Sequence, residues 1–206
     1  MLPPGRRERK KAETRRKIAD TARRLFLERG YDAVGIRDVA AEADVAVTTV
    51  FAHFASKEAL VFQQDQEFEQ GLVRAVTDRT PDEPLVPALR REVLALVRHC
   101  TADGSAPIRR MVEASPALRA YEDSMMLRHA EALAAAVAAD PGQPRSATAC
   151  RALARFAVDA YGLAREADDP QEAVDEVFRM IGAAWGAAAP AAAPAGTPAA
   201  GTATGS

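Results

Sequence analysis

The chain has 206 residues, of which 48% are hydrophobic and 5% aromatic, and its formal net charge is −2. This is enough apolar material for one medium domain, or for a small domain attached to a larger one. No run approaches the roughly 18 consecutive apolar residues that span a membrane, and the basic N-terminus lacks the apolar run of a signal peptide. We therefore expect a cytoplasmic protein without a membrane partner. Cys100 and Cys150 lack zinc-ligand spacing, so we expect buried free thiols, no metal and no cofactor.

The charge is divided unevenly along the chain. Residues 1–60 carry 13 Lys or Arg against 9 Asp or Glu, whereas residues 61–206 carry 14 against 20. The run from Arg6 to Lys17 alone holds eight basic residues. A basic end on an otherwise acidic protein indicates a polyanion bound at that end, although a solvated charged arm without a partner gives the same pattern.

Few aromatic residues, abundant Ala, Leu, Arg and Glu, and no alternating Val/Ile/Thr runs predict an all-α protein. A first helix is expected over residues 11–28 and ends at Gly30. Its buried face carries Ile18, Ala22, Leu25 and Phe26. Short helices are expected at residues 36–43 and 47–54. A long helix is expected to start near Ser56, whose hydroxyl can cap the next backbone amides.

Beyond Arg79 the proline-containing segment 80–84 interrupts the helical pattern. Five further helices are expected, at residues 84–101, 107–114, 116–139, 145–167 and 170–186. The Ser115-Pro116 pair is a strong helix-start signal. The last twenty residues are almost entirely Ala, Pro, Gly and Thr, so we expect a disordered tail.

Residues 36–54 have the pattern of two short helices around a tight turn. Their inner positions are Ile36, Val39, Ala40, Ala43, Val45, Val50 and Phe54. Ala40 is small where the two helices must approach closely, and Asp44 tolerates the left-handed backbone that the turn requires. The pattern predicts a helix-turn-helix, which binds DNA through its second helix.

The stretch from about residue 14 to residue 60 resembles the DNA-binding domain of the TetR family of regulators. The resemblance is carried by LFLERGYD after the first helix, by IRDVAAEA on the second, and by VTTVFAHFASKEAL from the third helix onward. The C-terminal helices share only the family's general length and plan. The resemblance implies a homodimeric repressor that a small-molecule ligand releases from a palindromic, double-stranded DNA operator.

The resemblance, together with the composition of the last twenty residues, divides the chain into three expected parts. Residues 1–60 form a three-helix helix-turn-helix domain with a basic N-terminal arm. Residues 61–186 form a helical ligand-binding and dimerisation domain, and residues 187–206 form the disordered tail. The chain departs from the family where Gly is frequent (Asp44), where a hydroxyl caps the recognition helix (Ala46) and where a Tyr reaches a phosphate (Phe51). These departures prevent the operator sequence from being transferred from relatives.

Helical spacing and the resemblance together place the DNA contacts. Val47, Thr48 and Ala52 face the bases, whereas Thr49, His53 and Lys57 face the phosphates, with the Phe51 ring beside them. Arg37 is the one long donor able to reach a guanine, but it could instead pair with Asp38 or Glu42 on the surface. His53 could likewise be a half-buried core histidine, and Lys57 a solvated residue in the first turn of a helix.

The central helices carry larger apolar side chains, whose usual role is ordinary core packing. A pocket among them follows from the family resemblance. Its candidate lining residues are His99, Met111, Tyr121, Met125, Met126, His129 and Tyr161.

The last two helices suit a four-helix bundle made from two subunits, as in the family's dimers, although they could also form a monomeric core. The candidate interface residues are Ala149, Ala152, Ala160, Val174, Val177, Phe178, Ile181 and Trp185.

Three other functions stay open. An enzyme could use His99, Cys100 and Asp103, but neighbouring helix residues do not face each other. A helical adaptor could use the three-helix unit to hold a protein. A DNA-binding dimer could also act without a ligand, or activate rather than repress.

Overall fold

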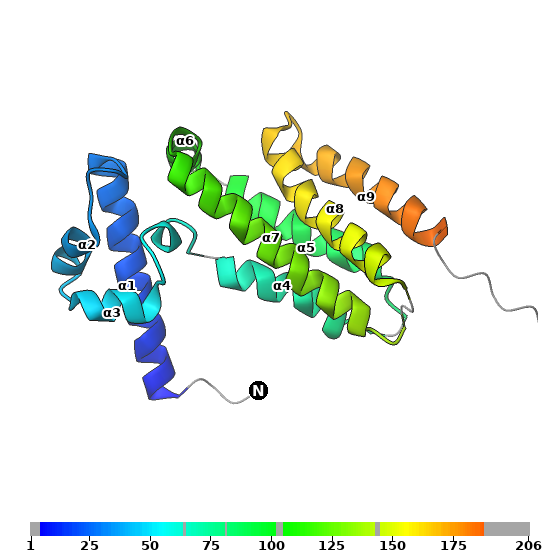
Figure 1. Ribbon diagram of the computed structural model, residues 1–206, viewed down its shortest axis with the longest axis horizontal. Coiled ribbons are helices and arrows are strands. Elements are labelled where there is room, and N and C mark those ends of the chain that lie inside the picture. Colours follow the sequence, from blue (N-terminus) through cyan, green and yellow to red (C-terminus); the bar gives the residue numbers. More distant parts are fainter. Residues whose placement is uncertain (1–4, 64, 81, 102–104, 143–144, 188–206) are drawn as a thin grey trace, which may run out of the picture.

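The computed structural model describes residues 5–63, 65–80, 82–101, 105–142 and 145–187 (Figure 1). Over these residues the chain is helical throughout, as the sequence predicts, and contains no strand. Its elements are α1 (Arg6–Arg29), α2 (Ile36–Glu42), α3 (Val47–His53), the 3-10 helix η1 (Glu58–Leu60), α4 (Asp65–Thr77), α5 (Leu85–Thr101), α6 (Ala106–Ala114), α7 (Pro116–Ala139), α8 (Ala147–Glu166) and α9 (Pro170–Ala187). Of the predicted tail, residues 188–206 lie outside the described residues, as does Asp103.

Helices α1, α2 and α3 form a small N-terminal unit beside the larger helical body (Figure 1). The predicted inner face of α1 is buried, and so are Val39, Ala40 and Ala43 of the second helix region together with Val50 and Phe54. Ile36 and Val45 are partly buried against the same cluster. The helix-turn-helix predicted from these positions is therefore present.

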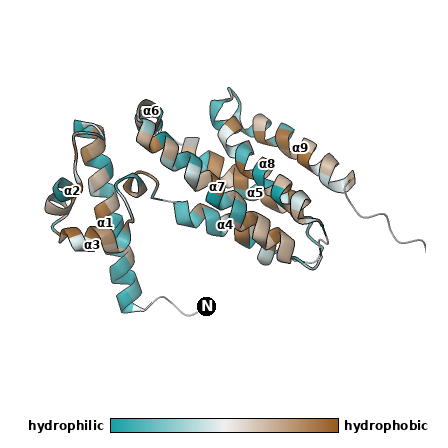
Figure 2. Ribbon diagram, in the orientation of Figure 1, coloured by the Kyte–Doolittle hydropathy of each residue, from teal (hydrophilic) through white to brown (hydrophobic). Residues whose placement is uncertain are grey.

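The basic N-terminal segment is a helix rather than the predicted arm. Helix α1 begins at Arg6 instead of Lys11, and its first turns extend past α3 (Figure 1). These turns are strongly hydrophilic (Figure 2). Gly5 precedes the helix, and its N–H donates to the Glu8 carboxylate at 3.2 Å. Charged residues with good helix propensity and this cap extend the helix beyond its apolar stripe.

The turn between α2 and α3 has the predicted backbone. Asp44 has φ of 51°, and it is the one non-glycine residue with positive φ in the described part of the chain. Ala46 precedes α3 without a side-chain cap, also as expected. The turn is instead tied by the Val45 N–H, which donates to the Ala40 carbonyl at 3.0 Å.

The long helix predicted from Ser56 is wrong. Ser56 does cap the chain, since its hydroxyl accepts from the Ala59 N–H at 3.3 Å. However, the helix is only η1, and α4 begins five residues later, at Asp65. Leu60 is fully buried in the N-terminal cluster, and Phe62 packs against α7. These two side chains fix the end of η1 and the segment that follows it, which local propensity does not predict.

The C-terminal body is a bundle in which α8 packs against α5, α7 and α9, while α4 packs against α5 and α7. The bounds of α5 to α9 agree with the prediction to within two residues. Ser115 caps α7, accepting from the Leu118 N–H at 3.4 Å. An almost buried ion pair between Arg79 and Asp140 joins the end of α4 to the end of α7.

Helices α6 and α7 also contact the N-terminal unit. Val112 of α6 and Leu118 of α7 belong to the same buried cluster as the helix-turn-helix core. The two parts of the chain therefore share a packed apolar contact. No helix within the described ranges is long and apolar enough to cross a membrane.

Candidate nucleic-acid interface and ligand cavity

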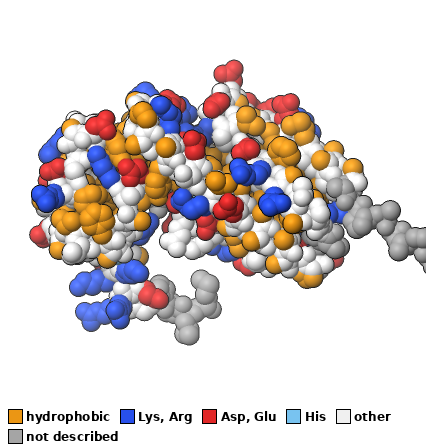
Figure 3. All heavy atoms as spheres, viewed as in Figure 1, with side chains coloured by type: hydrophobic (Ala, Val, Ile, Leu, Met, Phe, Trp, Pro, Cys, Tyr) orange, Lys and Arg blue, Asp and Glu red, His pale blue; other side chains and the backbone are white. Residues whose placement is uncertain are grey.

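Helix α3 presents its predicted DNA-facing side chains on its outer surface. Thr48 and Ala52 are exposed, Thr49 is half-buried, and Val47 and Phe51 are 36% and 53% exposed. Exposed apolar side chains of this size are costly in water unless a partner covers them. The hydrophobic side chains at this end of the molecule, and the basic ones beyond them, lie on one face (Figure 3).

Arg37 is exposed at the start of α2, and the two nearby carboxylates that could pair with it, Asp38 and Glu42, have other partners. Asp38 accepts from the Gly35 N–H at 2.7 Å. Glu42 pairs with Arg24 at 2.5 Å. The structure therefore pairs Asp38 and Glu42 with other groups and leaves the Arg37 side chain exposed on the surface.

His53 lies at the C-terminal end of α3 beside α1. Arg15 of α1 donates to the His53 carbonyl, and its guanidinium lies 4.2 Å from the centre of the Phe54 ring. Burial, followed by the positive charges of Arg15 and Lys11, holds the pKa of His53 below its ordinary value of 6.5. Arg15 therefore anchors the end of the recognition helix. This role of Arg15 was not predicted from the sequence, although Arg15 lies in the basic run from Arg6 to Lys17.

Lys57, which the sequence predicts to contact a phosphate, makes a contact within the chain. Its ammonium lies 4.1 Å from the centre of the Tyr31 ring. The Tyr31 hydroxyl in turn donates to Glu58 at 2.9 Å. Although burial alone would raise it, hydrogen bonds from Ser56, the backbone and Tyr31 lower the pKa of Glu58. These contacts place the Lys57 charge beside the helix-turn-helix.

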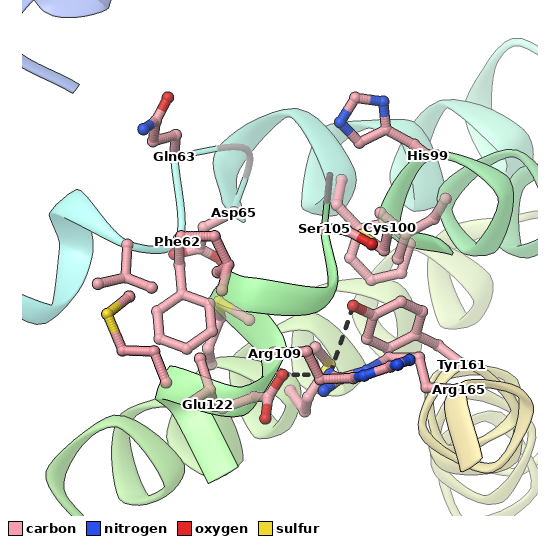
Figure 4. A pocket seen from close by; sticks show the side chains of 18 of the residues that line it. Phe62, Gln63, Asp65, His99, Cys100, Ser105, Arg109, Glu122, Tyr161 and Arg165 are labelled. Carbon is pink, nitrogen blue, oxygen red and sulfur yellow. Dashed lines mark hydrogen bonds and ion pairs between the residues drawn. The ribbon is translucent and has the colours of Figure 1, made fainter. Parts of the chain in front are cut away.

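A cavity of about 320 Å³ lies among α1, α4, α5, α6, α7 and α8 (Figure 4). Six of the seven predicted pocket residues line it: His99, Met111, Met125, Met126, His129 and Tyr161. Tyr121 is not in the wall; its ring stacks on that of Phe62, which does line the cavity, at 5.4 Å between centroids. Arg23 and Phe26 of α1 complete one side. The cavity is thus bounded partly by the DNA-binding unit.

Two groups of polar side chains lie in the cavity wall. In one, Asp65 accepts from His129 Nε2 at 2.5 Å and pairs with Arg128 at 3.3 Å. Burial alone would raise the pKa of Asp65, but the hydrogen bond from His129 and the charges of His129 and Arg128 lower it. Asp65 is therefore ionised at neutral pH.

In the other group, Arg165 pairs with Glu122 and donates to the Tyr161 hydroxyl at 3.4 Å (Figure 4). Burial raises the pKa of the Cys100 thiol, which borders the same group. A raised pKa is the opposite of what a nucleophilic cysteine needs. Within the described residues no group of three His, Cys, Asp or Glu could hold a metal.

Four of the predicted dimer residues are corrected by the structure. Ala160, Val174, Phe178 and Ile181 are at most 5% exposed and lie in the core of one protomer. Their side chains therefore pack inside the chain rather than on its outer surface. Ala149, Val177 and Trp185 are half-buried, and Ala152 is exposed. The large apolar side chains on the outer surface of α8 and α9 are instead Phe156, Leu163 and Met180, which are 54–60% exposed. Their spacing along α8 with Ala152 is the signal that could have identified this face.

The helix-turn-helix region matches a known family. Residues 18–63 match the model of the bacterial regulatory proteins of the tetR family. The chain is 30% identical over 189 residues to the putative mycofactocin biosynthesis transcriptional regulator MftR of Mycobacterium tuberculosis, covering 85% of this chain and 92% of that protein.

Shorter matches point the same way. The chain is 36% identical over 77 residues to the transcriptional repressor DhaR of Mycobacterium sp. strain GP1, covering 37% of this chain. It is 31% identical over 125 residues to the regulator TcmR of Streptomyces glaucescens, covering 57% of this chain. These matches span only 38% of DhaR and 55% of TcmR.

Solved structures share the fold. The TetR family repressor AlkX from Dietzia sp. strain DQ12-45-1b aligns with a TM-score of 0.58 at 19% identity, over 84% of this chain and 97% of AlkX. The SmeT-triclosan complex aligns with a TM-score of 0.57 at 21% identity, over 84% of this chain and 91% of SmeT. From the family match, the similarity to MftR along almost its whole length and the helix-turn-helix described above, this chain belongs to the TetR family of DNA-binding transcription regulators.

Proposed function

We propose that this regulator is a homodimeric repressor that acts in the cytoplasm, and that a small molecule in the cavity releases it from a palindromic operator. One observation carries this proposal: both the DNA-binding unit and the C-terminal helices contribute residues to the wall of the cavity. Arg23 and Phe26 come from the DNA-binding unit, whereas the remaining walls come largely from the C-terminal helices. An occupant would therefore contact both parts of the protein.

A short chain of contacts supports transmission from the cavity to the DNA-binding unit. Phe62 borders the cavity and stacks on Tyr121 of α7. The next residue, Gln63, donates from Nε2 to the Ala19 carbonyl of α1 at 3.0 Å. A ligand that displaces Phe62 would shift this link, and with it the angle at which α1 carries α3. A ligand can shift the equilibrium between two arrangements of the protein only if it binds one of them more tightly than the other.

Dimerisation through the outer face of α8 and α9 supports recognition of a palindrome. One seven-residue recognition helix contacts only a few bases, whereas two related by a twofold axis read two half-sites. Phe156, Leu163 and Met180 form an exposed apolar face of the kind that a second copy covers. Hydrophobic side chains lie on the surface over these helices in Figure 3.

For the DNA contacts, we propose the set predicted from the sequence with one addition. Arg37, Val47, Thr48 and Ala52 read bases, while Thr49, Phe51, His53 and Lys57 lie along the phosphates. The exposed basic residues at the start of α1 add further phosphate contacts. Arg6, Arg7, Arg9, Lys10 and Lys11 are all exposed there. Such contacts add affinity without sequence preference.

Binding-site selection from genomic DNA with the purified protein tests this function. We expect an inverted repeat bound by a dimer. Small molecules that raise the melting temperature of the protein are then added to the complex, and each true effector should raise the Kd for the selected site. Binders that leave this Kd unchanged would favour a ligand-independent regulator, and failure to select any repeat would favour an adaptor.

A further inference from the structure

The outward side of α3 consists of small and apolar side chains. Val47, Thr48, Phe51 and Ala52 are exposed, whereas Val50 is fully buried against the rest of the DNA-binding unit. Residues four apart share a side of a helix, so the four exposed side chains form two adjacent rows along α3. Thr48 alone among them carries a hydrogen-bonding group. The outward side of α3 is therefore an apolar patch with a single hydroxyl.

The charges around this patch favour DNA as the molecule that covers it. Residues 1–60 carry 13 Lys or Arg against 9 Asp or Glu, and the basic first turns of α1 extend past α3 (Figure 1). Hydrophobic side chains at this end of the molecule, with basic ones beyond them, also lie on one face in Figure 3. A groove that receives a recognition helix is flanked by phosphates. The apolar patch would then lie on base edges and the basic residues on the phosphates.

The residue types of α3 limit which base edges it can read. Bidentate recognition of guanine needs Arg or Lys, and that of adenine needs Asn or Gln. The sequence of α3, VTTVFAH, contains none of these four residue types. In the major groove thymine differs from cytosine by its 5-methyl group and by an acceptor in place of a donor. An apolar side chain can cover the methyl group but cannot distinguish the acceptor from the donor.

We infer that α3 reads thymine through its 5-methyl group, with Val47 on one thymine of each half-site and Ala52 on a second. The two residues are five positions apart, which is about 7.5 Å along a helix, whereas successive base pairs are about 3.4 Å apart. They therefore reach different base pairs. The inference rests on the proposed function, because it names the base that the same DNA-binding surface recognises.

Removal of single methyl groups from the selected operator tests the inference with the unaltered protein. Deoxyuridine replaces each thymidine and its symmetry mate in turn, which removes the 5-methyl group and keeps every hydrogen-bonding group of the base. A covered methyl group contributes about fourfold to the affinity, so uracil in both half-sites should raise the Kd by about 15-fold. Two thymine positions in each half-site should show this effect, and thymines outside the half-sites should show none. An operator that tolerates every uracil without a change in Kd overturns the inference.

A reciprocal pair of variants assigns each methyl group to its side chain. Val47→Ala should reduce the uracil effect at one thymine position to less than half and keep it at the other, whereas Ala52→Gly should do the reverse. Each variant is thus the control for the other. Because the thymine and uracil operators are compared within one variant, a general loss of affinity or of helix stability cancels. Undiminished uracil effects at both positions in both variants assign the contacts to other residues and overturn the inference.

The inference and the proposed function fail separately in these measurements. A selected inverted repeat that lacks thymine in its half-sites, or that binds equally well with uracil, overturns the thymine contact and keeps the palindromic operator. Failure to select any repeat overturns both. No small molecule is added, so the result does not depend on the release mechanism.

Discussion

Arg37 and Lys57 are both basic residues of the DNA-binding unit, but their surroundings suggest different roles. Arg37 is exposed and its neighbouring carboxylates bind elsewhere, so its planar guanidinium is free to match a guanine edge. Lys57 lies against the Tyr31 ring, which holds a compact charge near the surface without directing hydrogen bonds. We therefore expect Arg37 to read sequence and Lys57 to bind phosphate.

Arg37→Ala and Lys57→Ala should accordingly differ in kind. Loss of Arg37 should cost about 1 to 3 kcal/mol of binding free energy and relax the preference at one position of each half-site. Loss of Lys57 should weaken all duplexes nearly uniformly and reduce the salt slope by about two per dimer. Titrations of selected and scrambled duplexes at several salt concentrations measure both effects. If Lys57→Ala alters the preferred sequence and Arg37→Ala alters only the salt slope, the proposed docking is wrong.

His53 should make DNA binding depend on pH. Its pKa is lowered in the free protein by burial and by Arg15 and Lys11, so it is neutral at pH 7. A nearby phosphate would raise that pKa, and the complex would then take up a proton. By linkage, the Kd for DNA should fall as the pH decreases through and below about 6.5. His53→Gln should lose this dependence, whereas His99→Gln, on the cavity, should keep it. Equal pH profiles for the wild type and His53→Gln would exclude the phosphate contact.

At the scale of elements, helix α9 carries apolar side chains on two sides, of which one is buried in the core and the other is exposed. Phe178 is 3% exposed and packs inside the protomer, whereas Met180, two residues later, is 60% exposed. Both residues are hydrophobic, so a sequence pattern alone does not separate them. Their burial does: Phe178 contributes to the core, and Met180 belongs to the outer face that we propose as the subunit contact.

Substitutions at these two positions should separate folding from dimerisation. Phe178→Ala should lower the free energy of unfolding by about 3–5 kcal/mol, because it leaves a cavity in the core. Met180→Asp should keep the helical content and yield monomers that bind the operator weakly. Urea denaturation and sedimentation velocity measure the two outcomes. A dimeric Met180→Asp with unchanged affinity would show that another face joins the subunits.

The two turns of the DNA-binding unit offer a second comparison between elements. Gly30 has φ of 87°, and an added Cβ would meet nothing within 4 Å, so any cost of Gly30→Ala is backbone strain alone. We expect that cost to be about 1–3 kcal/mol, because φ of 87° with ψ of 148° lies in a region that is essentially restricted to glycine. Asp44→Gly, at φ of 51°, should be neutral or stabilising, because glycine adopts this conformation more readily. Thermal unfolding measures both changes. A stabilising Gly30→Ala would contradict the argument from backbone strain.

For the whole molecule, the shared cavity wall predicts reciprocal coupling between ligand and DNA. If a ligand raises the Kd for the operator by some factor, saturating operator must raise the Kd for that ligand by the same factor. Phe62→Ala should reduce this factor, since it removes the stack on Tyr121 that joins the connecting segment to α7. Leu127→Ala, at an exposed position of α7, is the control. Full coupling in Phe62→Ala would place the transmission elsewhere.

Much of the fold and of the DNA-binding unit could be predicted from the sequence alone. Helix α7 begins and ends at the predicted residues, because a Ser-Pro start and continuous helix propensity are local signals. The left-handed Asp44 and the inner face of the helix-turn-helix were also predicted, because the positions concerned lie within a few turns of each other. These features depend on contacts between near neighbours in the chain.

Only the tertiary structure decided three features. They are the position of the break before α4, the pairing of the polar groups in the cavity wall, and the choice of the side of α8 and α9 that faces outward. Asp65 and His129 are 64 residues apart, and Glu122 and Arg165 are 43 apart, so no local pattern joins them. Helix α8 carries Phe156 and Leu163 on its exposed side, and Phe156 therefore resembles a core residue in the sequence. Which side of such a helix is buried depends on where α5, α7 and α9 pack, and that packing is settled by contacts between distant segments.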